Sequence, residues 1–182
     1  FSDFCYDTRL LHEGELFLAV VTARGDGHDY VLEAAANGAA GVLCQRPFDL
    51  ASHGVTCIVV DDSRRALLDW ARFILRKLSP RVVDITGSSG KTTTKEMLAS
   101  ILSTTGPCLK NQGNLNNHIG LPLSLLQIED FHNYAVLEIG ANFPGEVRYL
   151  ASLSKPVAAV LTRIGWAHLE GFGRSEERRV GK

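Results

Sequence analysis

One stretch of the chain decides its fold, namely residues 82–98, with the sequence VVDITGSSGKTTTKEML. It begins with a β-branched run at 82–86, which suits a parallel strand buried on both faces. A turn with two glycines follows, and then a helix that we expect to end near Gly106-Pro107, with its apolar side formed by Met97, Leu98, Ile101 and Leu102. A strand, a glycine turn and a helix in this order provide the context of a phosphate-binding loop.

The turn has the sequence Thr86-Gly87-Ser88-Ser89-Gly90-Lys91-Thr92-Thr93. Its glycines permit backbone angles that point N–H groups inward, and the helix N-terminus adds partial positive charge. Lys91 would neutralise the terminal phosphates, and the Thr92 hydroxyl would bind Mg²⁺. The spacing GxxGKT is shorter than the general GxxxxGK[ST] pattern, and the alternative is a plain glycine turn with a solvated lysine. Because kinases, transporters, motors and ligases all contain such loops, the chemistry stays open here.

Short apolar runs alternate with helical patterns elsewhere, which predicts an α/β fold with a mainly parallel sheet. In the first half we expect a strand at 16–20, buried strands at 41–44 and 57–62, and helices at 29–40 and 64–78, the second with Ser63 as N-cap. In the second half we expect strands at 135–140 and 156–164, and helices at 122–128 and 145–153. Pro80 would end the preceding helix. We therefore predict two domains, at 1–79 and 80–182.

Bulk properties narrow the class of protein. Apolar residues make up 45% and charged residues 21% of the 182, which is typical of a soluble globular protein. The net charge of −1 gives no electrostatic reason to expect nucleic acid or an anionic membrane as partner. We find no span of the ~18 apolar residues that cross a bilayer and no signal-peptide pattern. Four cysteines without metal-ligand spacing suggest core thiols in a reducing cytoplasm. The first residue is not Met, so we expect the chain to begin inside a longer protein.

Three later features add candidate ligands. Residues 111–122, NQGNLNNHIGLP, form an asparagine-rich loop that could contact a nucleotide, or could be a surface turn. Glu138 lies within the apolar run AVLEIG, where a carboxylate is costly unless it is paired or binds a metal. His168 follows a strand end in AHLEGFG, and it could be a metal ligand or structural. The ends of parallel strands bind ligands, so Glu138 is a candidate for Mg²⁺.

Together these segments resemble the Mur ligases. The motifs are GSSGKTTTKEML, GNLNNHIGLPLSLL, AVLEIGANFPGEV and AHLEGFG, and the likeness extends over about residues 5–173. YDTRLLHEGELFLAV and the DGHDY turn resemble the UDP-substrate domain of the last two ligases of that pathway. The asparagine-rich stretch, EIGAN and HLEGFG resemble the ligase that joins D-alanyl-D-alanine to UDP-MurNAc-tripeptide.

The resemblance implies a cytoplasmic, ATP-dependent peptide ligase of peptidoglycan precursor synthesis that acts through an acyl phosphate. It implies ATP and Mg²⁺ as cofactors, UDP-MurNAc-tripeptide and D-alanyl-D-alanine as partners, and a monomer without nucleic acid or membrane insertion. Residues 1–79 would bind the UDP part, and 80–182 would be an incomplete ATP-binding domain. The implied site residues are listed by role as Lys91, Glu138 and His168 for catalysis; Gly87 to Thr93 with Asn117 for the nucleotide; Thr92, Glu138 and His168 for metal; and Thr8, Arg9, Asp26 and His28 for the UDP substrate.

Two features depart from the family. Arg163 stands where members usually have Asn, and the end RSEERRVGK is unlike the usual continuation. The family's carbamylated lysine therefore has no assigned counterpart, although Lys182 lies at about the right distance. By this resemblance the C-terminal domain would lie beyond the 182 residues, so we expect these residues alone to be inactive and to expose an apolar sheet edge. The alternatives are the ligase that adds the third peptide residue, a folylpolyglutamate synthase-like ligase, and a nucleotide-binding module without ligase chemistry.

Overall fold

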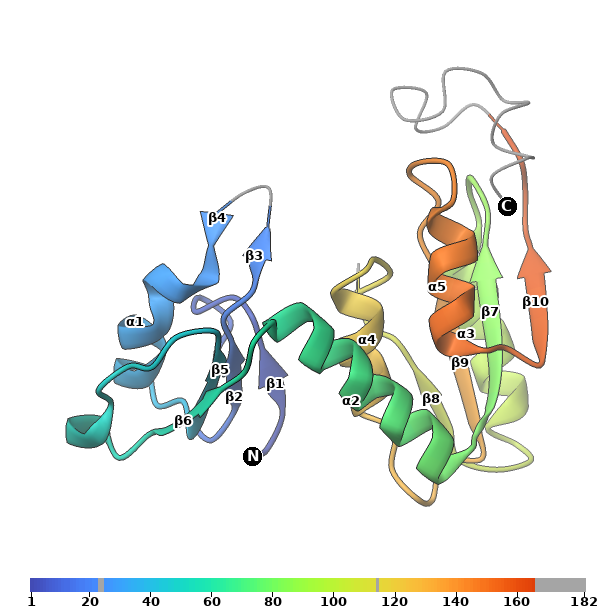
Figure 1. Ribbon diagram of the computed structural model, residues 1–182. Coiled ribbons are helices and arrows are strands. Elements are labelled where there is room, and N and C mark those ends of the chain that lie inside the picture. The colour runs from blue at the N-terminus through green and yellow to red at the C-terminus, as the bar shows by residue number, and fades with distance from the viewer. Residues whose placement is uncertain (23–24, 114, 166–182) are drawn as a thin grey trace. The chain divides into compact units, whose positions relative to one another are not determined.

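The computed structural model describes residues 1–22, 25–113 and 115–165, which form two compact units, Phe1–Asp69 and Trp70–Lys182 (Figure 1). The units divide between Asp69 and Trp70, within helix α2 (Ser63–Leu78), and not at the Ser79-Pro80 step that follows this helix. Both units combine helices with a parallel sheet, as predicted. None of the helices in these ranges is both long and apolar enough to cross a membrane.

The first unit is built on a four-stranded parallel sheet. Its order is β1 (Phe4–Cys5), β2 (Leu16–Leu18), β5 (Gly41–Cys44) and β6 (Thr56–Val59). After β2 come a hairpin of β3 (Val21–Thr22) and β4 (Gly25–Asp26), the 3-10 helix η1 (Gly27–Tyr30) and helix α1 (Val31–Ala36). A second 3-10 helix, η2 (Ala51–His53), precedes β6. The core comprises Phe17, Ala19, Val31, Ala34, Ala35, Ala39, Val42, Cys44 and Leu50.

Two local predictions for this unit were wrong. The strand expected to be buried at 57–62 is β6, which is partly exposed because it lies at the edge of the sheet. Ser63 does not cap α2, because the Asp62 carboxylate accepts hydrogen bonds from the N–H groups of Arg64 and Arg65. The Ser63 hydroxyl instead donates to the Ala19 carbonyl at 2.7 Å and so fixes the start of α2 to the end of β2.

The second unit contains the sheet that carries the phosphate-loop motif. Its strands are parallel and follow the order β10 (Ala158–Leu161), β7 (Arg81–Thr86), β9 (Tyr134–Glu138) and β8 (Cys108–Lys110). Helices α3 (Lys91–Leu102), α4 (Gly120–Leu126) and α5 (Glu146–Ser154) connect them (Figure 1). Central β7 confirms the prediction of a buried parallel strand, whereas β8 was not predicted.

Alternation along β7 separates the helices onto two faces. Ile85 packs with Ala99 of α3 and Val136 of β9, whereas the neighbouring Asp84 is bound by Ser154 of α5. Because successive side chains of a strand point to opposite faces, α3 and α5 cover opposite sides of the sheet. The sheet-facing side of α3 consists of Lys95, Leu98, Ala99 and Leu102, which share helical spacing.

The predicted apolar side of α3 was therefore half wrong. Met97 and Ile101 are each 62% exposed, whereas Leu98 and Leu102 pack against the sheet. Apolar residues at i, i+1, i+4 and i+5 form two neighbouring rows on a helix. Their spacing alone does not decide which row faces the sheet. The side that packs on the sheet includes the buried Lys95 and Ala99, and Met97 lies outside it.

Asp84 is a buried carboxylate in the middle of the sheet. Its Oδ2 accepts a hydrogen bond from Ser154 Oγ at 2.6 Å, and Oδ1 has no partner among the described residues. Burial raises the pKa of Asp84 to about 6, and the Ser154 hydrogen bond only partly opposes that shift. As pH rises from about 4 to above 6, the unfolded chain ionises first, so ionisation favours unfolding.

We expect Asp84→Asn to raise the free energy of unfolding at pH 8 by roughly 1–3 kcal/mol, because a raised pKa of this size is worth about that much. The gain should shrink towards zero below pH 4, where the Asp84 carboxyl of the unsubstituted chain becomes protonated in both the folded and the unfolded state. Urea unfolding at pH 4, 6 and 8 would measure it, with the exposed Asp130→Asn as control. A gain independent of pH would contradict this account of Asp84.

Candidate functional site

The glycine loop between β7 and α3 is held in place by the segment after β10. Ser88 donates its backbone N–H to the Arg163 carbonyl at 2.7 Å, and Thr162 Oγ1 donates to the Ser89 carbonyl at 2.7 Å. Gly87 has φ +149°, and a Cβ there would lie 2.0 Å from Thr162 Oγ1. Glycine is therefore required at 87 both for its backbone angle and for close packing.

The start of α3 presents positive charge to this loop. The N-cap is Gly90 at φ +81°, which has no side chain to bind the first N–H groups of the helix. Lys91 bends back so that its ammonium donates to the Gly87 carbonyl at 3.0 Å. Uncapped N–H groups, the helix dipole and an ammonium over the same loop favour an anion there. Ser89, Thr92 and Thr93 of this loop are exposed.

Glu138 lies beside the loop, at the end of the neighbouring strand β9. Its register partner on β7 is Ile85, so both chain segments reach the same sheet edge. Thr92 Oγ1 donates to Glu138 Oε2 at 2.8 Å, and Asn116 Nδ2 donates to Oε1 at 3.1 Å. The carboxylate is 5% exposed, so it depends on these donors. The structure thus brings together Thr92 and Glu138, the two described residues of the predicted metal set.

The other predicted ligands are placed differently. Asn117 Oδ1 accepts hydrogen bonds from the N–H groups of Ile119 and Gly120 at 3.0 and 2.9 Å, and so shapes the turn into α4. The predicted ligand His168 lies outside the described residues. Sequence reasoning missed Asn116, whose contact with Glu138 depends on a turn. The asparagine-rich stretch itself was identified from the sequence. The sequence did not show which of its asparagines would reach the carboxylate.

The donors at this edge suit Mg²⁺. A threonine hydroxyl and a carboxylate are oxygen ligands, and Mg²⁺ in phosphate sites typically uses one or two carboxylates together with substrate phosphates. In the ranges that the structure describes, no group of three or more His, Cys, Asp and Glu side chains could hold a metal ion. The Thr92–Glu138 pair thus fits a cation that is shared with a phosphate.

In the first unit, Thr8 and Arg9 follow strand β1, whereas Asp26 is the last residue of β4 and His28 lies in η1. Arg9 forms an ion pair with Asp7 at 2.5 Å, and its side chain is 83% exposed. This guanidinium holds the pKa of Asp7 below its ordinary value, mainly through their hydrogen bond. Thr8 is buried, and its carbonyl accepts a hydrogen bond from Asn37 Nδ2 at 3.3 Å. Arg9 therefore presents a cation to solvent on the loop after β1.

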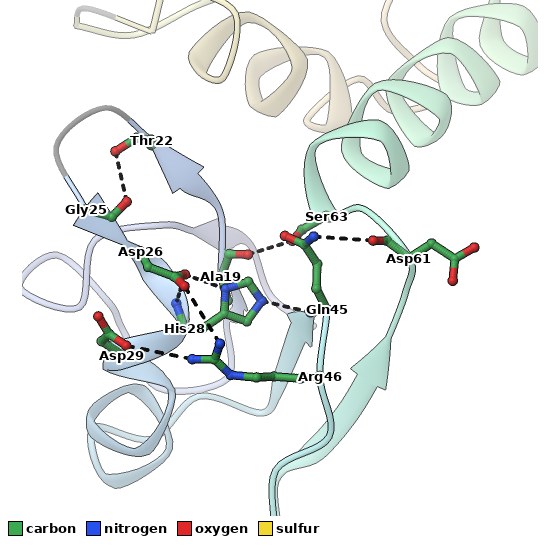
Figure 2. A network of polar contacts seen from close by, with 10 residues as sticks. All are labelled: Ala19, Thr22, Gly25, Asp26, His28, Asp29, Gln45, Arg46, Asp61 and Ser63. Atoms are coloured by element: carbon green, nitrogen blue, oxygen red, sulfur yellow. Dashed lines mark hydrogen bonds and ion pairs between the residues drawn. The ribbon is translucent and has the colours of Figure 1, made fainter.

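Asp26 and His28 form the centre of a polar network (Figure 2). His28 is 3% exposed, and its Nε2 accepts a hydrogen bond from the Gln45 N–H at 2.8 Å. Nδ1 must then carry the proton, which it donates to Asp26 Oδ1 at 2.5 Å. Arg46 lies 3.8 Å from Asp26 and 3.7 Å from Asp29. Hydrogen bonds from His28, first from its backbone N–H, lower the pKa of Asp26.

With both ring nitrogens bound inside the chain, His28 fixes the 25–28 turn to the end of β5. The ring thus holds neighbouring groups in place, and Asp26 and Arg46 lie nearer to solvent. The sequence suggested a site at this turn but could not reveal that the imidazole is enclosed.

The second unit has a parallel α/β fold with a phosphate-loop motif, and the first unit has an α/β fold with polar side chains at a strand edge. This combination is typical of a class of nucleotide-binding enzymes. Residues 85–179 match the family of the Mur ligase middle domain. The chain belongs to the Mur ligase family.

Two similar proteins share one name. The chain is 45% identical over 167 residues to UDP-N-acetylmuramoyl-tripeptide–D-alanyl-D-alanine ligase of Escherichia coli (strain K12), covering 92% of this chain and 36% of that protein. It is 42% identical over 170 residues to the enzyme of the same name from Bacillus subtilis (strain 168), covering 93% and 37%. The chain thus spans little more than a third of the length of these relatives.

Solved structures show the same fold. MurF from Acinetobacter baumannii superposes with a TM-score of 0.86 at 40% identity, covering 99% of this chain and 39% of that one. MurF ligase from Thermotoga maritima, solved in complex with ADP, gives a TM-score of 0.79 at 38% identity, covering 97% and 41%. A UDP-N-acetylmuramoyl-L-alanyl-D-glutamate–2,6-diaminopimelate ligase shares the fold at 22% identity and a TM-score of 0.51, covering 98% and 40%.

We expect His28→Ala to lower the free energy of unfolding of the first unit by roughly 1–3 kcal/mol, because it removes a buried ring together with its hydrogen bonds to the Asp26 carboxylate and the Gln45 N–H. The urea midpoint would measure this loss, and the exposed His53→Ala serves as control. Equal, small effects of the two substitutions would show that the His28 network is not structural.

We expect Gly87→Ala to weaken ADP binding at least tenfold, because the added methyl group would displace Thr162 from the loop. Titration with a fluorescent ADP analogue would show it. Gly54→Ala is a matched control, since Gly54 also has positive φ but open space around it. Unchanged ADP affinity in Gly87→Ala would mean that nucleotide does not bind at this loop.

Proposed function

We propose that this chain supplies the nucleotide-binding part and the first substrate domain of an ATP-dependent ligase. That ligase would join D-alanyl-D-alanine to UDP-MurNAc-tripeptide in the synthesis of peptidoglycan precursor in the cytoplasm. The observation that carries the proposal is the 2.8 Å contact between Thr92 and Glu138 beside the Lys91 loop. The similarity to ligases of that name supports the choice of substrate.

In this proposal ATP phosphates lie in the loop of residues 87–93. The backbone N–H groups of the loop and the Lys91 ammonium would stabilise the charge of the transferred phosphoryl group. Thr92 and Glu138 would hold Mg²⁺, which supplies charge neutralisation between the phosphates. Asn117 would approach the nucleotide, and His168 would contribute a second metal position.

The first step of the proposed reaction brings together two negatively charged groups, the tripeptide carboxylate and the γ-phosphate of ATP. The terminal carboxylate of the tripeptide attacks the γ-phosphorus of ATP and becomes an acyl phosphate, releasing ADP. The amine of D-alanyl-D-alanine then attacks the acyl carbon, and the tetrahedral intermediate collapses to the amide and phosphate. Lys91 acts in the first step by stabilising charge on the phosphoryl oxygens, while the loop keeps the γ-phosphate aligned with the carboxylate.

The first unit would bind the UDP part of the substrate at the carboxyl edge of its sheet, as is usual in α/β folds. Arg9 offers an exposed cation and Thr8 lies beside it, on the loop after β1. Asp26 ends β4 and is held by His28 of η1, whose ring also accepts a hydrogen bond from Gln45 after β5, so these two residues would shape that edge. This arrangement supports the substrate-domain role proposed for residues 1–79.

The choice among family members can be tested on the complete ligase with a panel of acceptors. D-Alanyl-D-alanine should support phosphate release, whereas diaminopimelate, lysine and glutamate should not. Release that depends on one of the latter would favour the ligase for the third residue or a folylpolyglutamate synthase-like enzyme. Release that no acceptor affects would favour a nucleotide-binding module. We propose a monomer, and expect the 182 residues alone not to form the amide.

We expect Lys91→Ala to lower the turnover of the complete ligase by about 10²–10³-fold, because one preorganised donor to the transition-state charge is lost. The same substitution should weaken ADP binding to this chain. Phosphate release and titration with a fluorescent ADP analogue measure the two effects, with Lys77→Ala on α2 as the control. Near-normal turnover of Lys91→Ala would remove this lysine from the mechanism.

A further inference from the structure

Behind the loop, the side chain of Asn111 holds the main chain of Glu138 from both sides. The Glu138 N–H donates to Asn111 Oδ1 at 2.8 Å, and Asn111 Nδ2 donates to the Glu138 carbonyl at 2.9 Å. Strand β8 ends at Lys110, whose register partner is Val136. The Asn111 amide therefore continues the ladder by imitating a peptide group, and it fixes the strand end that carries the carboxylate.

Asn111 is in turn attached to α3 by a buried lysine. Lys95 Nζ donates to the Asn111 carbonyl at 2.6 Å, and the residues are 2% and 1% exposed. Lys95 Nζ lies 3.5 Å from a Glu96 carboxylate oxygen. A buried ammonium is costly unless it is paired and hydrogen-bonded, so these contacts fix the place of the side chain.

Thr92 and Lys95 lie on one side of α3, because residues three apart are neighbours on a helix. The helix therefore contacts the end of β9 twice. Thr92 reaches the Glu138 carboxylate directly, and Lys95 reaches the Glu138 main chain through Asn111. The first contact uses the oxygens that a cation would need. The second contact does not involve those oxygens, and it fixes the position of α3 relative to β9.

We propose that Asn111 and Lys95 are positioning residues, which hold the Glu138 carboxylate at the distance from Thr92 that a divalent cation and a phosphate require. This inference rests on the proposed function of the loop. It assigns a purpose to a fully buried lysine that lies next to a phosphate-binding loop but does not face it. Outer contacts of this kind typically change metal affinity by about 10–100-fold when they are removed.

The test is the affinity for Mn²⁺ in the presence of saturating ADP, measured by electron paramagnetic resonance on this chain. We expect Asn111→Leu to weaken Mn²⁺ binding about tenfold. ADP affinity in EDTA and the urea midpoint should show whether the loop and fold are intact, and we expect ADP affinity to change less than about threefold. Asn111→Asp keeps the acceptor for the Glu138 N–H and should recover part of the Mn²⁺ affinity.

Lys95→Met keeps the apolar stem of the side chain and leaves both Asn111–Glu138 hydrogen bonds possible. It therefore remains informative if Asn111→Leu does not fold. We expect it to weaken Mn²⁺ binding several-fold, whereas Asn133→Leu and Lys77→Met should have no effect. Native Mn²⁺ affinity in folded Asn111→Leu or Lys95→Met would overturn the positioning role and leave the proposed function standing. A native chain that binds neither ADP nor Mn²⁺ would overturn both.

Discussion

The contact on which this structure depends is the hydrogen bond from Thr92 to Glu138. It joins the first turn of α3 to the end of β9, and both follow from the parallel order of the sheet. Parallel strands direct their carboxyl ends to one edge, so the glycine loop after β7 and the carboxylate on β9 meet without a long excursion of the chain. The Lys91 ammonium and the uncapped N-terminus of α3 lie at the same edge, and both are groups that favour an anion.

Two buried charged groups in the second unit show different solutions to the same problem. Lys95 donates a hydrogen bond to the Asn111 carbonyl and lies near the Glu96 carboxylate. Asp84 has one hydroxyl donor for two oxygens, and burial raises its pKa. The lysine network lies directly behind the loop, whereas Asp84 lies on the opposite face of the sheet with α5. Only the first therefore bears on the site.

The sequence predicted the features that are local. The glycine loop was recognisable because strand, turn, lysine and helix are contiguous, and Glu138 was recognisable because a carboxylate interrupts an apolar strand. Features that depend on tertiary contacts were not. The exposure of Met97 and Ile101 depends on which side of α3 meets the sheet, and the edge position of β6 depends on strand order. Asn111 and Lys95 gave no signal, since their roles exist only once β8, β9 and α3 are assembled.

The most direct measurement is a crystal structure of this chain with ADP and Mn²⁺, with the cation located by its anomalous scattering. The account predicts the diphosphate within the 87–93 loop and the Mn²⁺ beside Thr92 Oγ1, with Glu138 bound to it directly or through one water molecule. A nucleotide seated elsewhere, or a cation remote from both side chains, would contradict it.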